Sequence, residues 1–322
     1  MRYLKYLIVF SCSSFVILYL LYRLYIIGYN KYYSYEYKHI NEIVNGRTAN
    51  DILFIGSSRT VHHINPKLID SITGMGSYNA GVDGANLLEM SLILKSYLNS
   101  HPPPQILFID LAISSFAIDS LPFRDPNLYY QHLNNQIIYK GLKPYKRVFL
   151  FKYLPFTLFT EANDLLKQNS IRGYIGESDP LTKKSYKGFV DYGPDTLALP
   201  LKKRYRINYP IEKKGKALLQ EMVSICKKKN IQPIFTYAPE YQPEEKDYNP
   251  KLFPTIKEIS SSYNIPFVDF RTERVFENHR LFKNEHHLNH YGVEIYSAMI
   301  ANEIKISLKA TPTLEVSLKS SN

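Results

Sequence analysis

The sequence contains no tryptophan and two cysteines, and its 29 acidic residues are outnumbered by 40 basic ones, giving a net charge of +11. Two cysteines, Cys12 and Cys226, exclude a disulfide framework and a four-ligand zinc site. Cys12 lies in an apolar run, so we do not expect it to pair with Cys226. Hydrophobic residues make up 45% and charged residues 21% of the 322 positions. These fractions exclude a disordered or collagen-like chain and predict one or two folded domains.

A long uncharged run lies near the amino terminus. The stretch from Tyr6 to Tyr22 has 17 residues without a charge, and after Arg23 the apolar character resumes as far as Tyr29. A helix of this length spans the ~30 Å hydrocarbon core of a bilayer, and Arg23 can snorkel to the interface. We therefore predict a transmembrane anchor over residues 1–30 and a tyrosine-rich juxtamembrane linker over 31–50. A cleaved signal peptide fits less well, because the apolar run is long and no small-residue cleavage site follows it.

Short apolar segments alternate with helical patterns over the rest of the chain. We predict strands at residues 51–56, 77–82, 105–112, 231–238 and 266–270, and helices after Asn65-Pro66 and at 86–98, 215–229, 254–263 and 292–308. This alternation indicates βαβ units and a mostly parallel sheet covered on both faces. We assign residues 51–309 to one α/β domain with an insertion at about 114–210, and residues 310–322 to a disordered tail. Residues 148–159 form a core helix or a membrane-contacting segment, and we favour the core.

Three polar loops are expected at the same edge of this sheet, where open parallel sheets bind ligands. They are Gly56–Arg59, Asn79–Gly84 and Asn284–Asn289. A serine in a strand-to-helix turn, such as Ser58, becomes a nucleophile when a general base takes its proton, and His287 before the last helix can supply that base. A glycine such as Gly84 lets a backbone N–H approach a developing oxyanion.

The residues of these loops resemble a known superfamily. Gly-Ser-Ser after the first strand, Asn-x-Gly-x-x-Gly after the second, and Phe-x-Asn-x-x-His-Leu-Asn-x-x-Gly before the last helix are similar to the SGNH (GDSL-type) hydrolases and acyltransferases. The resemblance implies a flavodoxin-like three-layer α/β sandwich with a parallel sheet. It implies that Ser58 is the nucleophile, that His287 is the base, that Asn284 orients His287, and that the N–H groups of Ser58 and Gly84 form the oxyanion hole. No cofactor is implied.

The chain departs from the superfamily pattern at two places. Asn284 stands where an aspartate is usual; an asparagine accepts a hydrogen bond from His287, but it supplies no charge and, from sequence alone, does not fix the histidine tautomer. Glu285 or Asp269 can substitute as the orienting group. Residues 111–114, Leu-Ala-Ile-Ser, stand where many members have Gly-x-Asn, so the oxyanion-hole asparagine is not apparent. A weakly active or inactive protein therefore stays open beside an active enzyme.

Other polar residues near these loops admit more than one interpretation. We assign substrate binding to Arg59 and Asn79; Arg59 is adjacent to Ser58 and can bind an anionic group, or it is a solvated surface arginine. Five of the nine histidines fall at this edge, but no carboxylates with ligand spacing accompany them, so we expect no metal site. Nucleic acid is not expected as a partner despite the positive charge.

The resemblance also implies a setting. It is strongest to membrane-anchored, extracytoplasmic proteins of cell-envelope gene clusters, which include the D-alanyl transfer proteins of teichoic acid and the alginate O-acetyltransferases. We therefore expect O-acyl transfer or O-deacylation on cell-envelope polysaccharide by a domain outside the bacterial cytoplasmic membrane, with a membrane-bound acyltransferase as a possible partner. The alternative is a glycan-binding or assembly protein on the same fold that is weak or inactive as a catalyst.

Overall fold

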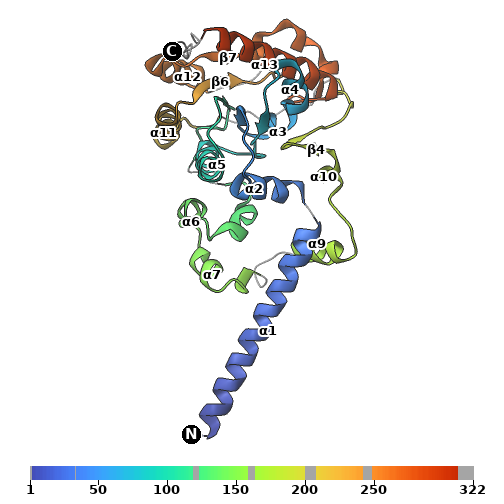
Figure 1. Ribbon diagram of the computed structural model, residues 1–322. Coiled ribbons are helices and arrows are strands. Elements are labelled where there is room, and N and C mark those ends of the chain that lie inside the picture. The colour runs from blue at the N-terminus through green and yellow to red at the C-terminus, as the bar shows by residue number, and fades with distance from the viewer. Residues whose placement is uncertain are drawn as a thin grey trace, which may run out of the picture.

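The structure is a computed structural model that describes residues 2–32, 34–118, 123–158, 164–199, 208–241 and 249–310. Its centre is a sheet of five parallel strands in the order β2-β1-β3-β6-β7 (Figure 1). The strands are β1 (Ile52–Ile55), β2 (Ser77–Asn79), β3 (Ile106–Asp110), β6 (Gln232–Tyr237) and β7 (Phe267–Asp269). This order is that of flavodoxin-like doubly wound sheets. The α/β fold predicted from the sequence is therefore confirmed.

Alternate side chains of the central strands enter two separate cores, as the two-residue period of a strand requires. Leu53 and Ile55 of β1 pack in one core, beneath α2 (Tyr35–Asn45), α5 (Leu87–Ser100), α11 (Lys213–Lys229) and α12 (Leu252–Tyr263). Ile52 and Phe54 pack in the other core, beneath α4 (Pro66–Thr73) and α13 (His290–Ala310). Both faces of the sheet are thus covered, which explains why the strand sequences are continuously apolar.

The predicted helices and strands are present, with ends that shift by a few residues. Asn65 and Asn86 cap α4 and α5, because their side-chain oxygens accept hydrogen bonds from Lys67 N and from Leu88 N and Glu89 N. After β7 the chain makes three short 3₁₀ turns, Phe270–Thr272, Arg274–Glu277 and His279–Leu281. It then forms the hairpin of β8 (Phe282–Asn284) and β9 (His287–Leu288).

The amino-terminal helix α1 (Arg2–Tyr32) extends away from the domain (Figure 1). Among the described residues it is the one helix long and apolar enough to cross a membrane. The segment after it differs from the predicted linker. Residues 35–45 form α2, whose Ile40, Ile43 and Val44 are buried in the core beneath the sheet. Most of the region 31–50 is therefore packed structure.

Residues 114–210, predicted as an insertion, contain short elements that extend from the side of the domain nearest α1 to the end of β2, where Asn79 N donates to Lys187 O (Figure 1). These are η1 (Pro126–His132), α6 (Gln136–Leu142), α7 (Val148–Tyr153), α9 (Asp164–Tyr174), α10 (Pro180–Lys184) and the hairpin of β4 (Ser185–Tyr186) and β5 (Phe189–Val190). The core interpretation of residues 148–159 is correct for Val148 and Phe151, which are buried, and wrong for Phe149 and Tyr153, which are exposed. Of the predicted disordered tail, Ala310 ends α13, and residues 311–322 lie outside the described residues.

Helices α1 and α9 cross at two glycines. A Cβ atom on Gly28 would lie 2.3 Å from Ser170 O, and one on Gly173 would lie 1.9 Å from Gly28 O. Both distances are shorter than van der Waals contact, so this crossing requires the absence of a side chain at each position.

We predict that Gly28→Ala destabilises the protein by about 1–3 kcal/mol, because the added methyl group overpacks the crossing. The loss should appear although alanine favours a helix more than glycine does. Thermal unfolding of the full chain in detergent micelles measures it. Gly76→Ala is the matched control, since its Cβ would have no neighbour closer than 3.8 Å. Equal stability of the two variants would contradict the close crossing.

Candidate active site

The first loop of the site is held by a buried charge. Helix α3 (Ser58–His63) begins directly after β1, so Ser58 occupies the turn at the carboxyl edge of the sheet. The next residue, Arg59, is 4% exposed. Its guanidinium donates to Glu240 Oε1 at 2.6 Å and to Leu111 O at 2.7 Å, and it lies 3.7 Å from Asp110 Oδ2. These contacts fix the start of α3 against the ends of β3 and β6.

The histidine predicted as the base lies beside this serine. His287 is the first residue of β9, and its Nε2 is 2.9 Å from the Oγ of Ser58. The two residues are 229 positions apart in the chain. The fold therefore brings together the first and the last of the sequence blocks within hydrogen-bond distance.

Asn284 fixes the tautomer of this histidine. Its Oδ1 accepts hydrogen bonds from the backbone N–H groups of His286 and His287, at 2.9 and 3.0 Å. These two donors identify the atom as the oxygen of the amide. The same Oδ1 is 3.1 Å from His287 Nδ1, which must then carry a hydrogen and donate it. Nε2 is left as an acceptor for the Ser58 hydroxyl, so the expectation that an asparagine leaves the tautomer open is wrong.

Asp269, considered as an alternative orienting group, has other partners. Its carboxylate pairs with Arg271 at 2.6 Å and accepts the hydrogen bond of Arg271 N. The side chain that contacts His287 Nδ1 is that of Asn284.

The surroundings of His287 disfavour its protonated form. Its pKa is lowered to about 4, chiefly by burial and also by the nearby His62, His286 and Arg59, while Asp83 raises it. The imidazole is therefore neutral near pH 7 and able to accept a proton. It is also a weaker base than an unperturbed histidine, because burial penalises the imidazolium and the partner of Nδ1 is an amide, not a carboxylate.

A second buried pair lies against His287 and was not anticipated from the sequence. His62 packs edge-on against His287 with ring centroids 6.0 Å apart, and it stacks on Tyr192 at 3.8 Å. Its Nε2 lies 3.2 Å from Asp83 Oδ1. Burial raises the pKa of Asp83, but the contacts with His62 and Arg124 prevail and lower it to about 2. The histidine cluster noted in the sequence was the one available signal for this pair.

The second loop joins the site through backbone contacts. Val82 N donates to Gly56 O at 3.0 Å, which places this loop beside the Ser58 turn. Gly84 has a φ of +71°, a conformation that glycine adopts without strain, and the side chain of Arg124 covers it. Within the described ranges, the N–H groups of Ser58 and Gly84 donate to no protein acceptor.

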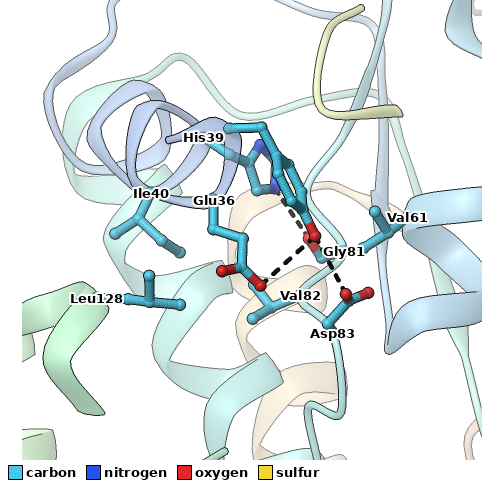
Figure 2. A pocket seen from close by; sticks show the side chains of 9 residues that line it. Glu36, His39, Ile40, Val61, Gly81, Val82, Asp83 and Leu128 are labelled. Atoms are coloured by element: carbon cyan, nitrogen blue, oxygen red, sulfur yellow. Dashed lines mark hydrogen bonds between the residues drawn. The ribbon is translucent and has the colours of Figure 1, made fainter. Parts of the chain in front are cut away.

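The same loop contacts the segment that follows the membrane helix. Tyr35 of α2 donates its hydroxyl hydrogen to Asp83 Oδ2 at 3.1 Å. Glu36 and His39 of α2 line a cavity of about 10 Å³ together with Gly81 and Asp83, and His39 Nε2 lies 2.9 Å from Gly81 O (Figure 2). The site is thus connected directly to the chain that leaves α1.

The structure corrects the two predicted substrate-binding residues. Arg59 is neither exposed nor available to a substrate, because its guanidinium is paired inside the protein. Asn79 is fully buried: its amide donates to Thr60 O and Ile64 O, and its oxygen accepts from Gly81 N. Both residues shape the loops of the site and do not reach its surface.

Residues 111–114 and the neighbouring histidines also have structural partners. Ala112 N donates to Ser115 Oγ at 2.7 Å, so the segment 111–114 ends in a local turn. His63 Nε2 accepts from Leu288 N, and the Nδ1 of His62 faces Val190 O. Across the described part of the chain no cluster of three histidine, cysteine, aspartate or glutamate residues has a geometry suited to a metal ion.

Comparison with known proteins gives no sequence relative. No family model matches, and no curated protein matches. Solved structures that align include an acetyl xylan esterase, with 10% identity over 80% of this chain and 98% of that one at a TM-score of 0.42. They also include a GDSL-like lipase from Bacteroides thetaiotaomicron, with 12% identity over 80% and 88% at a TM-score of 0.39.

A third aligned structure is a mutant of an acetyl-xylooligosaccharide esterase from Geobacillus, with 14% identity over 80% of this chain and 95% of that one at a TM-score of 0.41. Of these three names, that of the GDSL-like lipase is from the superfamily that the sequence blocks resemble. Structural similarity at these TM-scores does not show that this chain shares an activity with the aligned proteins.

We predict that Asn284→Asp strengthens the base. A carboxylate beside Nδ1 stabilises the imidazolium, so the pKa of His287 should rise from about 4. Since the neutral imidazole is the active form, wild-type ester hydrolysis should persist above pH 4 and fall below it. In Asn284→Asp that acid limb should move to higher pH, and the plateau of kcat/KM should rise on the order of 10- to 100-fold.

Asn278→Asp is the matched control, because Asn278 caps the 3₁₀ turn before the hairpin through Arg280 N. It adds the same charge without contact to His287. An unmoved acid limb in Asn284→Asp, or an equal shift in both variants, would contradict the proposed pairing.

Proposed function

We propose that the chain is a serine-dependent enzyme of ester chemistry that transfers or removes O-acyl groups on polysaccharide of the cell envelope. The observation that carries the chemistry is the hydrogen-bonded series from Ser58 Oγ to His287 Nε2 and from His287 Nδ1 to Asn284 Oδ1. A serine, a base and an orienting group in this order form the arrangement used for acyl transfer on unrelated folds.

Each residue has a role in the proposed reaction. The Oγ of Ser58 attacks the acyl carbonyl while its hydrogen passes to His287 Nε2, and Nδ1–H keeps its bond to Asn284. The N–H groups of Ser58 and Gly84 donate to the oxyanion of the tetrahedral intermediate. As the ester C–O bond breaks, His287 returns the proton to the leaving oxygen. A water or a sugar hydroxyl then attacks the acyl-serine, with His287 as base again, and Ser58 is restored.

Asn284 makes the proton transfer from Ser58 to His287 less favourable than an aspartate would, but it keeps His287 in the correct tautomer. In serine proteases the aspartate-to-asparagine change costs about 10⁴ in kcat because the histidine adopts the wrong tautomer. Here the backbone donors hold the amide oxygen toward Nδ1, so the correct tautomer is retained. The remaining deficit is the missing negative charge.

The substrate class and the location are supported by the sequence resemblance and by α1. A helix able to cross a membrane would hold the domain near surface polymers and lipid-linked donors. We place the domain outside the cytoplasmic membrane of a bacterium, with a membrane-bound acyltransferase as a candidate source of acyl groups.

The location has its own test. An alkaline phosphatase domain fused after Arg47, beyond α2, should be active in cells, because it folds only when exported. A fluorescent protein fused at the same position should be dark if it is carried across unfolded. An inactive phosphatase with a bright fluorescent fusion would reverse the orientation.

The nucleophile is tested with a fluorophosphonate probe on the purified full chain. We expect labelling of the wild type, loss of labelling in Ser58→Ala, and a decrease of at least about 10³-fold in His287→Ala. Ser57→Ala is the matched control, since Ser57 is adjacent and its side chain makes no capping hydrogen bond. It should label as the wild type does.

The second candidate is a glycan-binding or assembly protein on the same fold. The low pKa of His287 and the absent carboxylate favour it. It predicts no labelling of Ser58 in any variant together with measurable binding of envelope polysaccharide. Labelling that persists in Ser58→Ala would contradict the assignment of the nucleophile.

A further inference from the structure

An exposed apolar surface lies on the side of the domain nearest α1. Phe149, Leu150 and Tyr153 of α7 are 63%, 40% and 57% exposed, whereas Val148 and Phe151 of the same helix are buried. One face of α7 thus belongs to the core and the other presents large apolar side chains outward. Exposed clusters of this kind mark interaction surfaces.

The chain from α6 to the turn after α7 carries charge of one sign. Residues 136–158 contain five basic residues and no acidic residue. The basic residues are Lys140, Lys143, Lys146, Arg147 and Lys152, of which all but Lys152 are exposed. Lysine and arginine beside exposed aromatic and aliphatic side chains are suited to anionic lipid headgroups.

The turn after α7 reaches the membrane helix itself. The ring of Phe156 packs edge-on against the ring of Phe15, with centroids 5.1 Å apart. Phe15 is near the middle of the uncharged run of α1 and lies about 12 Å along the axis from Arg23, at 1.5 Å per residue. A bilayer that surrounds this run therefore also surrounds Phe156.

Three hydrogen bonds lie within this turn. Leu154 O accepts from Thr157 N at 2.9 Å and from Thr157 Oγ1 at 2.8 Å, and Leu158 N donates to Pro155 O at 3.1 Å. Each of these bonds satisfies backbone groups that would otherwise lack a partner in lipid.

Helix α9 adds a second set of apolar side chains beside α1 (Figure 1). Tyr174 Oη donates to Leu24 O at 2.7 Å, and Ser170 Oγ donates to Tyr25 O at 2.8 Å, which fixes α9 near Arg23. Ile171 of α9 and Ile175, directly after it, are 65% and 69% exposed.

We propose that α7, the turn Leu154–Leu158 and α9 form a second membrane contact that inserts into one leaflet of an anionic lipid bilayer beside α1. A single transmembrane helix leaves a domain free to rotate and tilt. A second contact beside it fixes the height and the orientation of the domain over the lipid surface. This proposal depends on α1 spanning the bilayer and not on the chemistry proposed for Ser58.

The absence of tryptophan makes a direct test possible. Phe149→Trp places one tryptophan on the exposed face of α7 in the full chain, reconstituted in vesicles of phosphatidylcholine and phosphatidylglycerol. Interfacial side chains lie about 5–10 Å into the headgroup–acyl boundary. Phosphatidylcholine brominated on the upper acyl chain should then quench the emission at least about two-fold relative to unbrominated lipid.

Two further single-tryptophan variants control the measurement. Phe10→Trp on α1 must be quenched if the chain has inserted, and Tyr263→Trp, 41% exposed on α12, must not be. Quenching of Phe149→Trp like that of Phe10→Trp supports the second contact. If Phe10→Trp is quenched while Phe149→Trp behaves like Tyr263→Trp, lipid does not cover this surface and the proposal is overturned; a protein partner would give that result.

The role of charge is tested in the Phe149→Trp background. Lys143→Glu combined with Lys146→Glu should reduce the quenching in vesicles with phosphatidylglycerol and leave it nearly unchanged in pure phosphatidylcholine. Equal quenching of the parent and the charge-reversed protein in both lipids would overturn the preference for anionic lipid.

Discussion

The guanidinium of Arg59 is a positive charge inside the protein, and the geometry of the site depends on the groups that neutralise it. Asp110 at the end of β3 and Glu240 after β6 face it, and the ring of Tyr237 lies 4.3 Å from it. Removing one partner of a buried ion pair typically costs about 3–5 kcal/mol, because the other charge stays uncompensated. The network therefore locks the turn that carries Ser58 to the carboxyl edge of the sheet.

Neutral hydrogen bonds position the other residues of the site relative to the Ser58 turn. The oxygen of Asn284 binds three N–H groups and so aligns His287 with Ser58 without a carboxylate. The nearby negative charge is that of Asp83. It pairs with His62, whose ring packs edge-on against that of His287. The outcome is a base with the right tautomer and a low pKa, a combination expected of a slow catalyst.

The sequence predicts the fold well because the strands are buried on both faces. Segments such as Ile52–Ile55 and Ile106–Asp110 are continuously apolar, and this signal does not depend on distant partners. The prediction of a linker at residues 31–50 is wrong, because the structure formed there does depend on distant partners. Helix α2 is short, and its buried face packs against α5, η1 and the loop after β2, all of them later in the chain.

The residues of the site also divide into those that the sequence predicts and those that depend on distant partners. Ser58 and His287 could be predicted because their blocks follow β1 and precede α13, and parallel strands place such blocks at one edge. The burial of Arg59 could not be predicted, since its partners Asp110 and Glu240 are 51 and 181 positions away. The tautomer set by Asn284 depends on the turn of the β8–β9 hairpin, which the sequence pattern does not specify.

The most direct test of the account is to trap the acyl group on the enzyme. The purified full chain is mixed with an activated acetyl ester, quenched in acid within the first turnover, digested and analysed by mass spectrometry. We predict one acetyl group on the peptide that contains Ser58, formed in the wild type and absent in His287→Ala. Acetylation at another residue, or hydrolysis that continues at the wild-type rate in Ser58→Ala, would contradict the central claim that Ser58, His287 and Asn284 form the catalytic series.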